Sequence, residues 1–263
     1  MSKPKRLIVI SIVIIWLAAA IAGFIHWQYV VPIVMYHSVS VLADPKNMTN
    51  VSVAVFERQM RFFKKHHYNV VPLARLAELM KNKRKIPAKT IAITFDDGYK
   101  NNYTFAYPIL KKYNLPATIF IIVDEVARPQ GDRLDWAQIK EMQASGLVTI
   151  GSHTLGPEPL INYKSDEALR AQIFDSKRLL EQALGVPVEI FSYPGGMFNA
   201  RIRQMVIDAG YKLAVATNPG KDYPRDDIFA IKRLRISENS GNLFVFGVET
   251  SGFYTFMKEH RHK

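Results

Sequence analysis

Two adjacent carboxylates, Asp96 and Asp97, follow a short apolar run and precede Gly98. The run, residues 89–93, is rich in apolar and β-branched side chains and is typical of a buried strand. Carboxylates at the end of such a strand must be solvated, paired with a cation or bound to a metal ion. Because side chains alternate along a strand, one of the two can serve as a metal ligand and the other as a general base. Taken alone, the triplet also fits an ordinary Asp-Gly turn.

Several further motifs follow in a fixed order along the chain. They are Pro32–Ser38 (PIVMYHS), Thr94–Tyr99 (TFDDGY), Pro116–Phe120 (PATIF), Ile150–Thr154 (IGSHT), Phe191–Gly196 (FSYPGG) and Lys232–Ile236 (KRLRI). In this order they resemble the polysaccharide deacetylases, which are carbohydrate esterase family 4 with the NodB-homology domain. The Y-P-x-G form of the third motif is similar to the membrane- or wall-associated branch of that family. The resemblance spans residues 32–236, which is most of the chain.

The resemblance implies a divalent metal site with a base beside it. Asp97 and His153 match metal ligands, for zinc or a similar ion, and Asp96 matches the catalytic base. Such an ion activates water and polarises the carbonyl that the water attacks. Asp96 needs a nearby cation to stay ionised, and the candidates for that role are Arg233 and Arg235.

The third motif implies the substrate-binding residues Tyr193, Pro194 and Gly195. The backbone N–H of Gly195 is the candidate donor to an oxyanion. The general acid is not identified, because the late L-x-H motif of the family is absent and residues 244–247 stand in that region without a histidine. His37, on the first predicted strand, is interpreted as a packing or supporting residue.

The second motif departs from the family pattern. The family has two histidines four residues apart, and this chain has His153 but Pro157 at the second position. Proline offers no side-chain ligand atom. The nearest alternative donor is Glu158, one residue out of register and next to two prolines that stiffen the loop. We therefore expect a metal ion that is bound weakly, with water or Glu158 completing its coordination.

Strands and helices alternate almost throughout the chain. The patterns predict helices over 53–63, 74–81, 102–113, 136–144, 166–184 and 202–209, and strands over 68–73, 89–93, 117–123, 148–151, 188–193 and 213–217. This alternation predicts an α/β fold with parallel strands. The motif residues fall at the carboxyl ends of strands, where the active sites of barrels lie. The family resemblance implies a distorted (β/α) barrel of the NodB type. The apolar segment described next adds one N-terminal transmembrane helix before it.

The N-terminal segment predicts export. Residues 7–25 form a segment without a charged side chain, and this segment is long enough to span a bilayer. Lys3, Lys5 and Arg6 precede it. This pattern indicates a single-pass anchor in the cell membrane with the folded part outside. A cleaved signal peptide is the alternative, since residues 20–22 have the small-x-small pattern, and cleavage after Ala22 would give a secreted protein.

We therefore divide the chain into five segments. They are a cytoplasmic basic stub (1–6), a transmembrane anchor or uncleaved signal (7–27), the N-terminal part of the barrel domain (28–87), a NodB-like deacetylase core (88–255) and a basic tail (256–263). The net charge of +12 favours an anionic membrane face or wall polymer as a neighbour. A basic surface without a specific partner is the alternative. No nucleic-acid motif is present, and the absence of cysteine suits an exported protein.

Two functions fit the sequence. The first is a hydrolase that removes acetyl groups from an N-acetylated extracellular or cell-wall polysaccharide by metal-assisted attack of water on the amide. The second is a membrane-anchored glycan-binding protein that has lost catalysis with its second histidine. The survival of Asp96, Asp97 and His153 favours the hydrolase, and the oligomeric state stays open.

Overall fold

Short parallel strands form the centre of the structure. The computed structural model describes residues 10, 12–21, 23, 30–82, 84, 86–128, 131–217 and 227–254. The main strands are β1 (Ile33–Tyr36), β4 (Asn69–Val70), β5 (Thr90–Phe95), β6 (Ala117–Ile121), β7 (Val148–Ser152), β8 (Ile190–Ser192), β9 (Leu213–Ala216), β10 (Ile231–Lys232) and β11 (Leu234–Arg235). They pair in the order β10-β9-β8-β7-β6-β5-β1-β11, with β4 added beside β5. A separate pair, β2 (Ser38–Ser40) and β3 (Asn50–Ser52), is also parallel.

Residues 231–235 bring the two edges of the main sheet together. The first half of this segment, β10, pairs with β9, and the second half, β11, pairs with β1. Arg233 lies between the halves, and its N–H donates to the carbonyl of Ala216 at 3.0 Å. One extended segment therefore joins both edges, and the sheet becomes a nearly closed barrel. This confirms the predicted (β/α) barrel.

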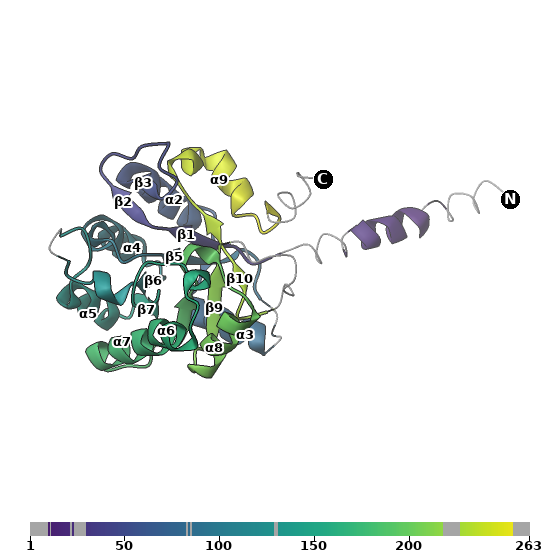
Figure 1. Ribbon diagram of the computed structural model, residues 1–263. Coiled ribbons are helices and arrows are strands. Elements are labelled where there is room, and N and C mark those ends of the chain that lie inside the picture. The colour runs from purple at the N-terminus through teal and green to yellow at the C-terminus, as the bar shows by residue number, and fades with distance from the viewer. Residues whose placement is uncertain are drawn as a thin grey trace.

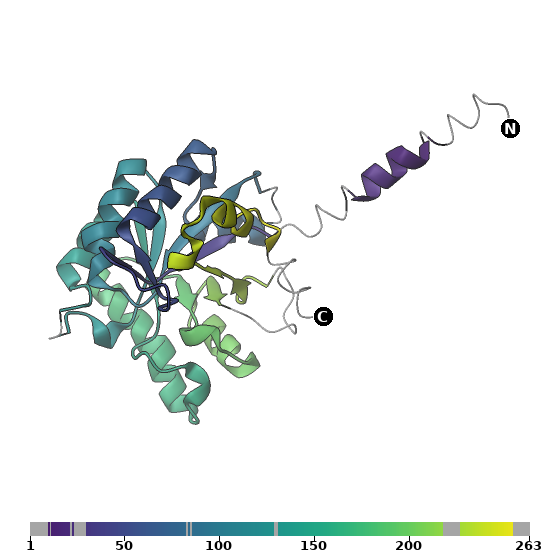
Figure 2. The same cartoon turned by 90° about the horizontal axis from the view of Figure 1, so that it is seen from above.

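Helices surround the strands, as Figure 2 shows from above. They are α2 (Val53–Lys65), α3 (Leu73–Lys81), α4 (Tyr107–Tyr113), α5 (Trp136–Ala144), α6 (Asp166–Arg170), α7 (Ser176–Leu184), α8 (Ala200–Asp208) and α9 (Leu243–Glu249). Local sequence sets their ends: Ser52 caps α2, Asp135 and Gln138 form a capping box at α5, and Gly185 ends α7 in a left-handed conformation. The two longest predicted helices contain a π turn each, η1 (Asn102–Ala106) and η4 (Ala171–Asp175).

Apolar side chains alternate between two separate cores. On β5, Ile91 and Ile93 belong to the large core between the barrel and its helices, whereas Ala92 belongs to a smaller cluster inside the barrel. The interior cluster takes one or more residues from six strands, mostly near their beginnings, and Leu73 and Leu76 of α3. Helix α3 therefore covers the amino-terminal end of the barrel. The opposite end, where the strands finish, is left for polar side chains.

The predicted membrane span 7–27 falls partly outside the described residues. Its described residues, 10, 12–21 and 23, are helical, and Figure 1 shows them away from the barrel. Within the described ranges, no helix has the length and apolar character that crossing a bilayer requires. The basic stub 1–6 and the tail 256–263 lie outside the described residues.

Candidate active site

Five polar side chains line the carboxyl end of the barrel interior. Each lies an even number of positions after an interior residue of its own strand, so alternation carries it to the inside. They are His37 after β1, Asp96 after β5, His153 after β7, Ser192 at the end of β8, and Arg233 between β10 and β11. All five come from different strands, so the barrel itself sets their relative positions.

Asp96 and Arg233 form a buried, bidentate ion pair. Arg233 Nη1 donates to Oδ1 at 2.7 Å, and Nη2 donates to Oδ2 at 2.6 Å. Nη2 also donates to Ser192 Oγ at 2.9 Å, and Nη1 to Thr94 Oγ1 at 3.3 Å. Asp96 is 3% exposed and Arg233 4%. Arg235, the other candidate cation, is exposed on β11; Arg233 is therefore the partner of Asp96.

This pair decides the charge of Asp96. Burial alone would raise the pKa of the carboxyl group. The Arg233 charge, followed by His153 and the hydrogen bonds from Arg233, outweighs burial and holds the pKa of Asp96 well below its usual range. Asp96 is therefore a carboxylate at neutral pH and can accept a proton.

His153 is held in one tautomer. Its Nδ1 lies 2.8 Å from the carbonyl oxygen of Ser192, and a carbonyl can only accept, so Nδ1 carries the hydrogen. In the neutral ring, the form that binds a metal ion, the lone pair is then on Nε2, which lies 3.5 Å from Asp97 Oδ1 and 3.9 Å from Asp96 Oδ2. A backbone carbonyl that orients a histidine ring in this way is typical of metal-binding histidines.

Asp97 and His153 fit two positions around a divalent metal ion. Two donors bound at about 2.1 Å to a tetrahedral zinc ion lie about 3.4 Å apart, and the two donor atoms here are 3.5 Å apart. Over the described part of the chain, no group of three or more His, Cys, Asp or Glu side chains is placed to hold a metal ion. The pair is therefore suited to a metal but forms an incomplete site, because catalytic zinc sites usually have three protein ligands.

The loop after His153 explains the incomplete site. Pro157 and Glu158 are both exposed. Glu158 accepts a hydrogen bond from the side chain of Asn162, so its carboxylate is engaged within its own loop. The prediction that Glu158 completes the coordination has no support in this arrangement.

Two residues beside the site adopt a left-handed backbone conformation. Asp97 has φ 69° and Thr154 has φ 75°, a region that non-glycine residues rarely adopt and that costs free energy. At Asp97 this turn breaks the strand alternation, so Asp97 and Asp96 both approach His153. The two carboxylates therefore serve the same centre, although a regular strand would point them apart.

His37 belongs to the site, which the sequence interpretation missed. Tyr36 pairs with Phe95, so His37 follows β1 where Asp96 follows β5. The pKa of His37 is lowered overall: burial lowers it most, the charges of Asp96 and Asp97 raise it, and those of Arg233 and His153 lower it. Its Nδ1 is buried and has no hydrogen-bond partner among the described residues.

Of the three predicted substrate-binding residues in the third motif, two are buried and one is exposed. Tyr193 is fully buried on the outer side of β8, stacked on Phe198, and its hydroxyl donates to the carbonyl of Phe229. Because it follows Ser192, alternation turns it away from the barrel interior; the predicted substrate contact by this ring is wrong. Pro194 is also buried, whereas Gly195 is exposed in a left-handed turn with φ 62°.

Ser192 is the second residue that the sequence interpretation missed. Its hydroxyl accepts from Arg233 and lies 3.5 Å from Asp96 Oδ2, and its carbonyl orients His153. The available signal was register: Ser192 and His37 each stand two or four positions after an apolar residue that faces the barrel interior.

The chain is similar to known proteins over most of its length. Residues 83–214 match the polysaccharide deacetylase family model. YxkH of Bacillus subtilis (strain 168), whose name assigns it to the polysaccharide deacetylases, is 33% identical over 220 residues, which is 83% of this chain and 76% of YxkH. A poly-β-1,6-N-acetyl-D-glucosamine N-deacetylase of Staphylococcus aureus (strain MRSA252) is 28% identical over 201 residues, 73% of this chain and 69% of the relative.

A solved structure shows the same fold. The Streptococcus pyogenes deacetylase PplD, determined in complex with acetate, superposes with a TM-score of 0.73 at 28% sequence identity. The match covers 82% of this chain and 97% of PplD. From the family model and these relatives, this chain belongs to the polysaccharide deacetylase family.

Proposed function

We propose that this chain hydrolyses acetyl groups from an N-acetylated polysaccharide. The observation that carries the proposal is the meeting of two acidic groups at one histidine: Asp96 and Asp97 lie 3.9 Å and 3.5 Å from Nε2 of His153. One carboxylate is held ionised by Arg233, and the other faces a histidine lone pair. The named substrate of the Staphylococcus aureus relative supports a polymer of β-linked N-acetylglucosamine as the substrate class.

The residues divide the reaction between them. Asp97 and His153 would hold a divalent ion such as zinc, which supplies Lewis acidity toward the acetyl carbonyl and acidifies water. Asp96 accepts the proton of the attacking water, and Arg233 keeps Asp96 ionised and oriented. The exposed backbone of Gly195 is the candidate donor to the oxygen that becomes negative. The C–N bond then breaks, and acetate and a free amine are the products.

The leaving nitrogen needs a proton, and His37 is the candidate donor. Its half-buried ring lies near the charges of Asp96, Asp97, Arg233 and His153, and its buried Nδ1 has no hydrogen-bond partner among the described residues. His37→Gln keeps a polar side chain but cannot carry this proton, so we expect acetate release to fall about 10²–10⁴-fold. The fall in acetate release should be smaller for an amide substrate with a more acidic leaving amine, because that amine leaves with less help from a proton donor. Equal losses on both substrates would assign His37 a packing role.

Substitution of the base tests the proposal. In Asp96→Asn, acetate release from β-1,6-linked N-acetylglucosamine oligomers should fall about 10²–10⁴-fold, while oligomer binding by calorimetry persists. Because this variant unbalances the charge of Arg233, circular dichroism and thermal melting must confirm its fold. Asp97→Asn is a second variant outside that ion pair, and it should lose both metal affinity and acetate release. Unchanged release in Asp96→Asn would refute its role as the base.

One observation favours the alternative, a glycan-binding protein without hydrolysis. Position 157 is an exposed proline, and two metal ligands are weaker than three. The alternative predicts that wild type binds the oligomers but releases no acetate with zinc, cobalt, manganese or nickel, and that Asp96→Asn does not alter binding. Acetate release at any of these metals excludes it.

The place of action is part of the proposal. The uncharged segment 7–25 behind Lys3, Lys5 and Arg6 supports an anchor in the cell membrane with the barrel outside. The mature N-terminus of the protein from the membrane fraction tests this by intact mass. An N-terminus at Gly23 in most of the material would show a cleaved signal peptide.

A further inference from the structure

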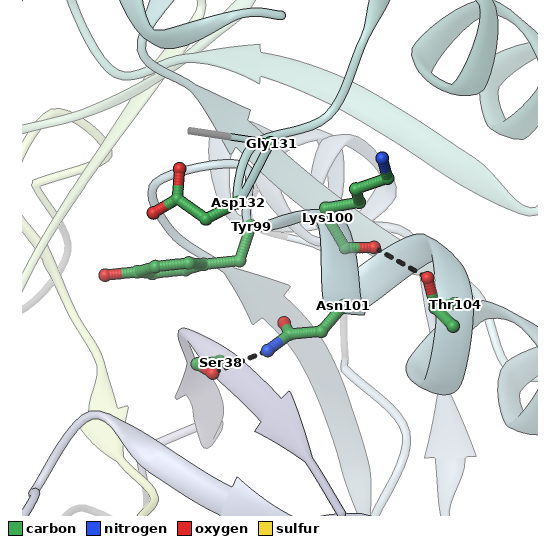
Figure 3. A pocket seen from close by; sticks show the side chains of 7 residues that line it. All are labelled: Ser38, Tyr99, Lys100, Asn101, Thr104, Gly131 and Asp132. Carbon is green, nitrogen blue, oxygen red and sulfur yellow. Dashed lines mark hydrogen bonds between the residues drawn. The ribbon is translucent and has the colours of Figure 1, made fainter. Parts of the chain in front are cut away.

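An open pocket lies beside the turn that carries Asp96 and Asp97. It has a volume of about 430 Å³, within the range of ligand pockets in proteins. Tyr99, Asn101, Ser38 and Asp132 are among its lining residues (Figure 3). None of these four side chains takes part in the reaction described above.

The Tyr99 ring is held as a rigid platform. The backbone around Tyr99 pairs with that around Arg133, through hydrogen bonds from Leu134 N to Gly98 O and from Lys100 N to Asp132 O, both 2.9 Å. The Arg133 guanidinium lies 4.0 Å from the centre of the Tyr99 ring, a cation–π contact.

A buried carboxylate forms an ion pair with the arginine. Glu125 is 2% exposed and lies 3.4 Å from Arg133 Nε. The half-buried Tyr99 ring therefore packs against Arg133 on the protein side and borders the pocket. A ring that is already ordered loses little conformational entropy when a ligand stacks on it.

Polar groups around the pocket retain hydrogen-bonding capacity. Asn101 donates to Ser38 Oγ at 2.7 Å and accepts from Val39 N at 3.2 Å, which leaves the Ser38 hydroxyl hydrogen available. The Asp132 side chain is 57% exposed, and its Oδ2 accepts from Arg133 at 2.9 Å. A flat apolar ring with hydroxyl and carboxylate groups at its edge suits a pyranose sugar, which has an apolar C–H face and hydroxyl groups around its rim.

The pocket is adjacent to the reacting centre. Tyr99 follows Asp97 by two residues, so their Cα atoms are at most about 7.6 Å apart. A sugar on Tyr99 would therefore sit next to the sugar whose acetyl group is removed.

We propose that this pocket binds a neighbouring pyranose of the same polymer, with Tyr99 as the stacking surface and Ser38 and Asp132 as hydrogen-bonding groups. The inference rests on the proposed deacetylase function and adds that the protein binds at least two adjacent sugars. Substrate length then becomes part of recognition.

The test compares two substrates in the full-length protein. They are the β-1,6-linked N-acetylglucosamine tetramer, which reaches the pocket, and 4-nitrophenyl acetate, which is too small to do so. Tyr99→Ala should lower kcat/KM for the tetramer about tenfold more than for the ester, mainly through KM. Tyr99→Phe keeps the ring and should restore most of the tetramer affinity. Tyr103→Ala is the matched control, because Tyr103 is a half-buried tyrosine of η1 that is bonded to Glu141 and does not line the pocket.

Each outcome decides the inference. Equal falls on tetramer and ester in Tyr99→Ala would mean that Tyr99 acts only by supporting the catalytic turn, and an unchanged KM for the tetramer would mean that no sugar binds there; both overturn it. If wild type releases no acetate from either substrate, the proposed function fails, and calorimetric titration with the tetramer decides the pocket alone. Weaker binding by Tyr99→Ala than by wild type then supports the pocket, and equal binding overturns it.

Discussion

The ion-pair network around Asp96 and the loop after His153 belong to the same site but differ in every physical respect. Asp96, Ser192 and Arg233 are buried, come from three parts of the barrel wall and bond to one another. Pro157 and Glu158 are exposed on one loop. The side chains of the barrel wall are bonded to one another, whereas the described part of this loop places no third metal-ligating side chain beside Asp97 and His153.

The difference reflects what each change costs the fold. Removing one partner of a buried ion pair leaves an unbalanced charge, whereas an exposed loop residue can change at almost no cost. However, replacing both partners with apolar residues of similar size is often neutral or stabilising. Stability alone therefore does not account for a carboxylate and a guanidinium at the mouth of the barrel, and the pair points to chemistry.

The largest expected effect comes from breaking the ion pair. Arg233→Met leaves the Asp96 carboxylate buried without a cation, so the free energy of unfolding should fall by about 3–5 kcal/mol. Arg235→Met is the matched control: it removes an exposed arginine two residues away and should change stability by no more than about 0.5 kcal/mol. Urea unfolding of both variants measures the difference. Equal losses of unfolding free energy in the two variants would show that the buried ion pair of Arg233 adds no stability beyond that of an exposed arginine.

Acidity should reduce that difference. Because the pKa of Asp96 is lowered in the folded state, its contribution to stability is complete above the unfolded pKa of about 3.9 and is lost as the pH falls through the lower folded pKa. In wild type, the ionisation of Asp96 therefore changes the free energy of unfolding only at pH values below about 4. The gap between wild type and Arg233→Met should be narrower at pH 3 than at pH 7, and a gap independent of pH would contradict the pairing.

Repairing the loop should have an intermediate effect. Pro157→His restores the second histidine of the family motif and should tighten divalent metal binding at least about tenfold. Glu158→Gln, next to it, removes a carboxylate that is bonded to Asn162 and should leave metal affinity unchanged. Calorimetric titration with zinc measures both. If Pro157→His and wild type bind zinc equally, the wild-type site is either complete already or not formed.

The smallest effect tests the corrected position of Tyr193. Tyr193→Phe removes one hydrogen bond, to the carbonyl of Phe229, and should cost about 0.5–1.5 kcal/mol of stability. Thermal melting measures that loss, and KM for the tetramer should stay within twofold of the wild-type value because the ring does not reach the substrate. A large rise in KM without loss of stability would restore the tyrosine to the substrate site.

Sequence patterns predicted the barrel well because its strands and helices carry strong local signals. The predicted strand 89–93 overlaps β5 from Thr90, and the predicted helix 53–63 lies within α2. Boundaries differ by a few residues, and β4 contains two residues of the six predicted from 68 to 73. The closing segment 231–235 and the β2–β3 pair depend on contacts between distant residues, so periodicity does not reveal them.

The site was predicted where the family resemblance assigns a role to a residue of a motif, and it was missed where only the register of a strand shows that role. Asp96, Asp97 and His153 stand in motifs, and the structure brings them together. His37 and Ser192 enter through the inward alternation of β1 and β8, which requires knowing which face of each strand is the interior. The predicted substrate contact of Tyr193 is wrong for the same reason: the residue stands in a motif, but its side chain lies on the outer face of β8.

We propose that Asp96 and Arg233 in the barrel wall carry out hydrolysis and that the metal site at Asp97 and His153 limits its rate. The most direct measurement is acetate release from the β-1,6-linked N-acetylglucosamine tetramer by the full-length protein, first stripped by a chelator and then titrated with zinc. We expect no release in the stripped protein, recovery with added zinc, and saturation at a zinc concentration at least about tenfold higher for wild type than for Pro157→His. Release that survives chelation, or the absence of release at every zinc concentration in both proteins, would contradict the account.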